Sequence, residues 1–240
     1  MAERQHAMKR FYKLVSVAPG SAASAFAIQL DGRGIKTPAK NTLEMPSKPL
    51  ADAMAEEWDA QTDEIVPATM PLTSLAYTAL DHIEANKADV LGQMAQYAET
   101  DLLCYFAGDD QELLAKQQAA WRPMIDWAAE QFGVALNTTD NLMPVAQAPD
   151  TKALILKQLE AIDSWRLASL SVTTALSGSV ILGLGLAKKR LTAAQVFAAS
   201  TLDETHQAER WGEDQEAAER RAHIAEELTQ AERFLNLLDV

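Results

Sequence analysis

The sequence is poor in cysteine, which limits the chemistry that it can support. Its 240 residues include a single cysteine, Cys104, so an internal disulfide and a zinc site built from several cysteines are both excluded. This usage is typical of a reducing compartment. Because Cys104 lies in the apolar run from Leu102 to Phe106, we expect a buried small residue rather than a nucleophile.

The signature motifs of several enzyme classes are also missing. No G-x-x-x-x-G-K-[ST] sequence is present, so there is no P-loop to hold phosphates. Gly183 and Gly185 form only a short G-x-G inside an expected helix, which argues against a dinucleotide site. Ser177-Gly178-Ser179 lacks the first glycine of a G-x-S-x-G elbow. We therefore expect no enzyme activity, no catalytic residue, no cofactor and no bound nucleotide.

Positive charge is scarce. Lysine and arginine number 21 against 34 aspartates and glutamates, which gives a formal net charge of -13. Such a surface repels polyanions, so neither nucleic acid nor an anionic membrane is an expected partner. The acidic residues spread along expected helix faces, which is typical of a solvated surface. They could equally form a face that attracts a complementary protein patch.

The longest stretch without a charge is residues 167–187. Its length would span a bilayer, but its many hydroxyls and glycines make it less hydrophobic than a leucine-rich span. We expect two close-packed core helices that break near Ser177-Gly178, and no membrane insertion. Residues Met1 to Lys9 are polar and too short for a secretory signal. We expect a bacterial cytoplasmic protein, or a mitochondrial matrix protein if the chain is a processed organelle protein.

The remaining patterns predict an α+β fold. Phe26 to Leu30 alternates like a half-buried strand, and Asp31-Gly32 supplies a tight hairpin turn. Helices follow after Pro46, where Ser47 can act as the cap. Few aromatic residues and many small apolar ones favour packed helices for the rest. We predict a small N-terminal β-hairpin/α unit over residues 1–85 and a larger all-α helical domain over residues 86–240.

Two residues are expected to have structural roles. Trp58 most simply anchors its helix in the core, with contact to a partner as the alternative. Asp101 falls between apolar neighbours, so burial would require a hydrogen-bond partner or a cation. We favour a structural network for Asp101 over a functional site.

A third patch, Trp211-Gly212-Glu213-Asp214, is the candidate for partner binding. The apolar seam of the last expected helix, extended backwards from Ala218, reaches Trp211 and places Asp214 where an apolar residue is expected. Two acids beside an exposed aromatic ring would suit protein docking. The alternative is that Gly212 starts a new helix, whose positive end Glu213 and Asp214 complement.

A metal site is the alternative source of activity. Asp203, His206 and Glu209 could share part of one helix face, which is the kind of cluster that binds a divalent metal. A solvated acidic helix produces the same pattern. The competing functions are therefore a metal-dependent enzyme of unrecognised type and a helical scaffold or regulatory protein with another partner.

The order of several short motifs carries a family resemblance. The motifs are Arg10-Phe11-Tyr12-Lys13, Leu30-Asp31-Gly32-Arg33, Thr37-Pro38-Ala39, Glu57-Trp58, Met70-Pro71-Leu72-Thr73, Thr100-Asp101-Leu102-Leu103-Cys104-Tyr105 and Trp211-Gly212-Glu213-Asp214. With these motifs, the chain resembles the alpha-subunit-binding assembly chaperones of the F-type ATP synthase catalytic head, which occur in mitochondria and alphaproteobacteria. The resemblance extends from about residue 10 to residue 235, and Gln215 departs from it where an acid is expected.

The resemblance implies a function as well as a fold. It implies a two-domain, ATP-independent chaperone that binds the unassembled alpha subunit and prevents its aggregation until the beta subunit replaces the chaperone. It implies a bacterial relative of the mitochondrial assembly factor. Within that interpretation, we expect Glu213 and Asp214 to contact the partner and Trp211 to support them.

Overall fold

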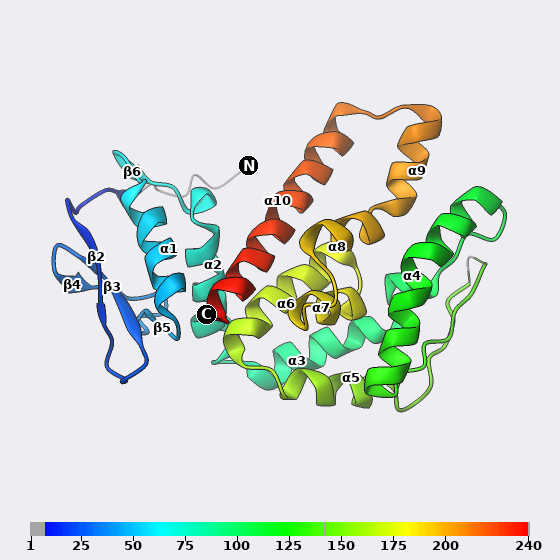
Figure 1. The fold of residues 1–240 in the computed structure, drawn as a ribbon, viewed down its shortest axis with the longest axis horizontal. Coiled ribbons are helices and arrows are strands. Elements are labelled where there is room, and N and C mark those ends of the chain that lie inside the picture. Colours follow the sequence, from blue (N-terminus) through cyan, green and yellow to red (C-terminus); the bar gives the residue numbers. More distant parts are fainter. Residues whose placement is uncertain (1–7, 142, 240) are drawn as a thin grey trace. The chain divides into compact units, whose positions relative to one another are not determined.

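The computed structural model describes residues 8–141 and 143–239, which form two compact units (Figure 1). Among the described residues, the first unit comprises residues 8–85 together with 233–239, and the second comprises residues 86–141 and 143–232. This division differs from the expected one in residues 233–239, which group with the first unit instead of the second. Whether the two units fold independently stays a prediction.

The first unit contains two small antiparallel sheets. Its strands are β1 (Met8–Lys9), β2 (Val15–Pro19), β3 (Phe26–Leu30), β4 (Arg33–Gly34), β5 (Glu44–Met45) and β6 (Glu64–Ile65). Strand β3 pairs with β2, β4 and β5, while β1 and β6 form a separate two-stranded sheet. The β3–β4 hairpin turns at Asp31 and Gly32, whose φ angles of 50° and 77° are both positive. The expected hairpin is therefore present.

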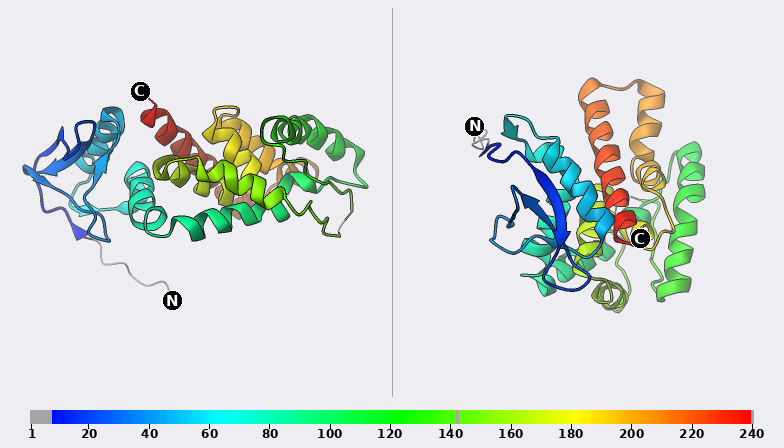
Figure 2. Two further views of the ribbon diagram at one scale, coloured as in Figure 1. Left: turned by 90° about the horizontal axis from the view of Figure 1, so that it is seen from below. Right: turned by 60° about the vertical axis from the view of Figure 1, so that its left-hand side comes forward.

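Two helices complete the first unit. Helix α1 (Lys48–Asp59) packs on the β2–β3 sheet (Figure 2), and helix α2 (Pro71–Tyr77) continues as one π-helical segment over residues Thr78–Ile83. Ser47 caps α1, since its side chain accepts a hydrogen bond from Leu50 N.

The second unit is helical. Its helices are α3 (Lys87–Gln96), α4 (Gln111–Phe132), α5 (Thr151–Glu160), α6 (Ser164–Ser177), α7 (Val180–Ala187), α8 (Ala193–Ser200), α9 (Leu202–Trp211) and most of α10 (Gln215–Leu238), with short 3-10 turns at Tyr97–Glu99 and Leu102–Cys104. A small unit with β-sheets and a larger helical one confirm the predicted α+β class.

The uncharged stretch forms helices α6 and α7, as predicted. Gly178, with a φ of 68°, ends α6, and α7 is buried from Val180 to Leu186. The two helices pack closely, because a Cβ atom added to Gly183 would lie 2.5 Å from Thr174 Oγ1. None of the helices in the described part of the chain combines the length and the apolar character that a membrane span requires.

The sequence spacings of Thr192 with Gln195 and of Thr201 with Glu204 predict two capping boxes, and one of them forms. Thr192 and Gln195 bond reciprocally at the start of α8. The Thr201 hydroxyl accepts from no N–H group of α9, and it donates to Phe197 O, 2.8 Å away in the preceding helix. The backbone of Thr201, with a φ of -105° and a ψ of 15°, is also not the extended one that an N-cap residue usually has.

Candidate protein-binding site

Helices α9 and α10 form an antiparallel hairpin, and residues 211–214 at its turn are called the hairpin tip here (Figure 1). Two side-chain links join the helices below the tip. Arg221 donates to Thr205 Oγ1 at 3.0 Å, and Arg220 pairs with Glu204. The structure thus brings Trp211, Glu213 and Asp214 together on one turn, which this pair of helices supports.

Trp211 is the most exposed of the large apolar side chains in the described residues, with 76% of its surface accessible. Gly212 has a φ of 87° and separates the two helices, so Trp211 ends α9 while α10 begins only at Gln215. Of the two alternatives, the structure has the one in which a new helix starts after Gly212, and no continuous helix carries the seam from Ala218 back to Trp211. An exposed indole is costly to leave in water and is a favoured anchor at protein interfaces.

Both acids of the tip are exposed and also have local partners. Asp214 Oδ1 accepts hydrogen bonds from the backbone N–H groups of Glu216 at 2.8 Å and Ala217 at 3.4 Å, which is the geometry of a helix cap. Glu213 pairs with Arg221. The geometry of Asp214 thus agrees with the alternative in which these acids complement the start of a helix. Because a carboxylate has several acceptor sites, capping leaves Asp214 able to bind a partner as well.

A polar network behind the tip fixes α9 against α4. His206 is 3% exposed, with its Nε2 at 3.0 Å from Asp110 Oδ2 and its Nδ1 at 3.2 Å from Lys116 Nζ. An ammonium group can only donate, so Nδ1 accepts from Lys116 and Nε2–H donates to Asp110.

Asp110 joins the same network to the start of α4. Its carboxylate accepts from Leu113 N at 3.0 Å and lies 2.5 Å from an Arg210 nitrogen. The Leu113 N–H and the His206 hydrogen bond lower the pKa of Asp110 to about 2. Asp110 therefore remains ionised and continues to attract Arg210 in the last turn of α9, near the tip.

The three residues of the predicted metal cluster do not converge on a common point. Asp203 accepts from Gln117 Nε2 at 2.8 Å, and Glu209 pairs with Lys116 at 2.9 Å, while His206 faces Asp110. Within residues 8–141 and 143–239, no group of three or more histidine, cysteine, aspartate or glutamate side chains could hold a metal ion. Instead of a metal ion, residues of helix α4 and its cap Asp110 are the partners of these three side chains.

Asp101 lies fully buried between two helical segments. It caps the 3-10 turn Leu102–Cys104 by accepting from Leu103 N at 3.1 Å, and its other oxygen accepts from Ile181 N at 3.3 Å in the first turn of α7. Burial raises the pKa of Asp101 to about 6, although these hydrogen bonds oppose the shift. The residue links two elements within the second unit.

Trp58 and its neighbour Glu57 lie in the core of the first unit. Trp58 is 7% exposed, and the hydroxyl of Tyr12 donates to its carbonyl oxygen at 2.7 Å. Glu57 accepts from the N–H groups of Leu72 at 2.8 Å and Thr73 at 2.9 Å, at the start of α2. Burial raises the pKa of Glu57. In the sequence, Glu57 stood out only within the motif Glu57-Trp58, and no role was predicted for it, although the helix start at Pro71 needed an acceptor.

Comparison with known proteins places this fold among chaperones. Residues 9–129 match the family model described as ATP12 chaperone protein. The structure superposes on Atp12 from Paracoccus denitrificans with a TM-score of 0.89 at 35% identity, covering 96% of this chain and 98% of that one. A mutant of the same Paracoccus protein gives a TM-score of 0.90 at the same identity and coverage.

Fungal mitochondrial proteins are more distant relatives. The Schizosaccharomyces pombe protein atp12, mitochondrial, is 26% identical over 227 residues, which is 90% of this chain and 77% of the relative. The Saccharomyces cerevisiae protein ATP12, mitochondrial, is 25% identical over 248 residues, covering 85% of this chain and 76% of the relative. The fold is thus that of a chaperone family. The chain belongs to the ATP12 chaperone family.

Proposed function

We propose that this protein is an ATP-independent chaperone that binds the unassembled alpha subunit of the F-type ATP synthase catalytic head and prevents its aggregation. The observation that carries the proposal is the likeness to Atp12 from P. denitrificans, at a TM-score of 0.89 and 35% identity over 96% of the chain. An alpha subunit without its beta neighbour exposes an apolar interface, and such surfaces aggregate.

The hairpin tip is the proposed contact with the client. It presents Trp211, 76% exposed, beside the exposed carboxylates of Glu213 and Asp214. An indole buried at an interface contributes about 2 kcal/mol or more when its surroundings exclude water. The two acids favour a client patch that carries lysine or arginine. The network of Asp110, His206 and Arg210 keeps α9 in place beneath the tip and so limits the entropy lost on binding.

Release requires a competitor. The sequence has no P-loop, so hydrolysis is not the proposed source of energy. A chaperone of this kind stabilises its client by equilibrium binding, and a beta subunit with higher affinity for the same surface displaces it. We place this cycle in the bacterial cytoplasm, or in the mitochondrial matrix for an organelle protein. No catalytic step is part of the proposal.

Light scattering tests the proposal. An ATP synthase alpha subunit diluted from denaturant should scatter less in the presence of an equimolar amount of the chain, with or without ATP. Beta subunit added afterwards should release the chain from the complex on size-exclusion chromatography. Scattering that is the same with the chain as with serum albumin would contradict the proposal, as would protection that depends on ATP.

A further inference from the structure

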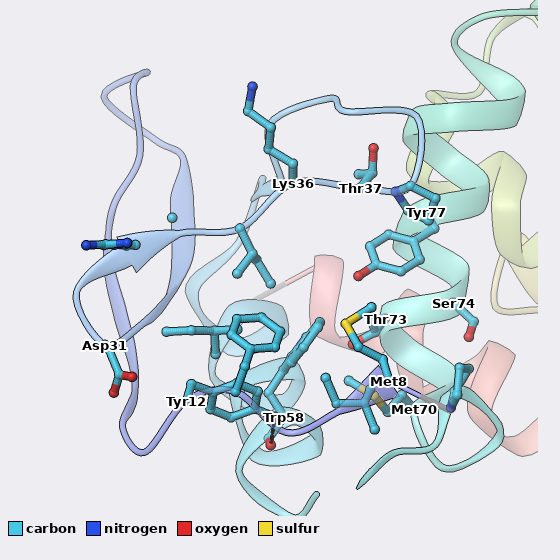
Figure 3. A pocket seen from close by; sticks show the side chains of 18 residues that line it. Met8, Tyr12, Asp31, Lys36, Thr37, Trp58, Met70, Thr73, Ser74 and Tyr77 are labelled. Carbon is cyan, nitrogen blue, oxygen red and sulfur yellow. Dashed lines mark hydrogen bonds between the residues drawn. The ribbon is translucent and has the colours of Figure 1, made fainter. Parts of the chain in front are cut away.

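The first unit contains a pocket of about 930 Å³ that the proposed client contact at the hairpin tip does not use (Figure 3). Ligand pockets of proteins usually have volumes of about 300–1,000 Å³. The lining is mainly apolar and aromatic, and includes Met8, Phe11, Tyr12, Trp58, Met70 and Tyr77. All of the lining residues lie between Met8 and Tyr77, so the pocket is formed within one unit.

Two hydrogen-bonding groups of the lining have no hydrogen-bond partner among residues 8–141 and 143–239. The Trp58 indole Nε1 is buried with no acceptor among the described residues, which is an unfavourable state for an N–H group. The hydroxyl of Tyr77 extends from α2 into the pocket (Figure 3), and burial raises the pKa of this tyrosine to about 12. Tyr77 can donate directly to a ligand.

Apolar surface continues outside the pocket. Met8 and Phe11 line it and yet are 59% and 65% exposed, and Leu14 and Val66, in the adjoining segments, are 71% and 44% exposed. Four of the six large apolar residues that are exposed in the described chain therefore belong to this part of the first unit. A small ligand confined to the pocket would leave this surface in water, whereas a polypeptide would cover it.

The charge at the rim is positive, although the chain as a whole is acidic. Arg33 and Lys36 line the pocket, and neither forms an ion pair within the part of the chain that the structure describes. The lining carboxylate, Asp31, already accepts hydrogen bonds from Leu14 N at 2.9 Å and Lys13 N at 3.1 Å. The two cations are therefore available to a carboxylate of a partner.

We infer that this pocket binds an extended segment of the client polypeptide. The segment carries one large apolar side chain for the pocket and an aspartate or glutamate, a few residues away, for Arg33 and Lys36. A backbone carbonyl of the segment accepts from Tyr77. The inference rests on the proposed function in taking the alpha subunit as the source of the segment, and it adds a second contact to the one at the hairpin tip.

Binding of labelled peptides tests this inference. Short overlapping peptides that cover an ATP synthase alpha subunit are labelled with fluorescein and titrated with the full chain by fluorescence anisotropy. We expect binding by peptides that combine a large apolar residue with a nearby acid. Phe11→Asp should weaken it at least about tenfold. Loss of the hydroxyl in Tyr77→Phe should weaken it about fivefold.

A matched control variant distinguishes binding in the pocket from non-specific hydrophobic binding. Met143→Asp makes the same kind of change at an apolar residue that is 71% exposed and lies in the second unit, so it should leave the affinity unchanged. Near-UV circular dichroism checks that each variant keeps the fold. Equal loss in Phe11→Asp and Met143→Asp, or no binding of any peptide, would overturn the inference. Binding of dodecanoate without any peptide would overturn it in favour of a small-amphiphile site.

The light-scattering assay distinguishes the two proposals. If the wild-type chain protects the alpha subunit and Phe11→Asp protects it equally well, the second contact is wrong while the proposed function stands. If the wild-type chain does not protect the alpha subunit, the proposed function is wrong. In that case, the peptide titration still decides whether the pocket binds an apolar, acidic segment.

Discussion

Asp101 Oδ2 accepts a hydrogen bond from the backbone N–H of Ile181, 3.3 Å away and 80 positions further along the chain. The contact places a buried carboxylate at the start of α7, where free N–H groups and the helix dipole favour negative charge. Glu57 has the same role at the start of α2 in the first unit. In each unit, therefore, a buried acid joins two segments that are separate in sequence.

The burial of Asp101 predicts a pH-dependent stability. Its pKa is raised to about 6 in the folded chain from an ordinary value of 3.8. Between these values the folded chain keeps a proton that the unfolded chain has lost, so the contribution of Asp101 is fully present below about pH 4 and is lost as the pH rises through about 6. Asp101→Asn cannot titrate and sets an amide against N–H donors, which costs about 1–3 kcal/mol.

Urea unfolding of both proteins between pH 4 and pH 7 checks this prediction. The difference in unfolding free energy between the wild type and Asp101→Asn should shrink as the pH rises. A difference that stays constant, or that grows with pH, would show that Asp101 does not carry a raised pKa.

The burial of His206 between α9 and α4 predicts that its removal destabilises the folded chain. His206→Ala would remove the group between Asp110 and Lys116 and leave a buried hole, so we expect a loss of about 2–3 kcal/mol in unfolding free energy. His223→Ala is the control, because the side chain of His223 on α10 is 71% exposed and its loss should cost less than about 0.5 kcal/mol. Similar urea midpoints for the two variants would argue against a structural role for the His206 network.

Two glycines predict opposite effects of the same substitution. Gly183→Ala would bring a methyl group to 2.5 Å from Thr174 Oγ1 and 3.3 Å from Leu170 O, so we expect a loss of about 1–3 kcal/mol. Gly92 on α3 has no atom within 4 Å of the added methyl group, so Gly92→Ala should stabilise the chain by about 0.5–1 kcal/mol. Thermal unfolding of both variants measures the contrast. A stable Gly183→Ala protein would refute the close packing of α6 and α7.

At the hairpin tip, substitutions can test the negative charge of Asp214 separately from its role as a helix cap. Asparagine caps a helix about as well as aspartate, so Asp214→Asn should keep the start of α10 while removing the charge. Asp214→Lys removes both and places a positive charge at the tip. We expect affinity for the alpha subunit to fall about tenfold in Asp214→Asn and further in Asp214→Lys, and about thirtyfold in Trp211→Ala.

Affinities measured by calorimetry, with circular dichroism as the check on folding, decide this prediction. If Asp214→Asn binds like the wild type while Asp214→Lys does not, the negative charge of Asp214 is not a client contact. If Trp211→Ala also binds normally, the client binds elsewhere on the chain.

Local signals in the sequence predicted much of the fold. The turn at Asp31-Gly32, the break at Gly178 and the capping box of Thr192 depend on residues within a few positions of one another, and each forms as expected. Thr201 was misjudged because α9 follows α8 directly at this residue, so its backbone is not extended as in an N-cap. A local pattern does not tell how closely one helix follows another.

The hairpin tip and the His206 network could be predicted only in part from the sequence. The sequence placed Trp211, Glu213 and Asp214 together, but it left open whether one helix continues through Gly212 or a new one starts there, and the structure separates α9 from α10 at this glycine. It left Asp203, His206 and Glu209 as either metal ligands or part of a solvated acidic face, because periodicity reveals a shared face and not the partner that the face meets. Helix α4, about a hundred positions earlier in the chain, supplies that partner.

The central claim is that this chain protects an unassembled ATP synthase alpha subunit by equilibrium binding alone, without catalysis. The most direct measurement is mass spectrometry of the affinity-tagged full chain purified from its own cells, with a Trp211→Ala, Asp214→Lys double variant in parallel. The account predicts that the wild type brings down the alpha subunit free of beta, and that the double variant brings down much less. A wild-type complex without the alpha subunit, or one in which alpha and beta arrive together in equal amounts, would contradict it.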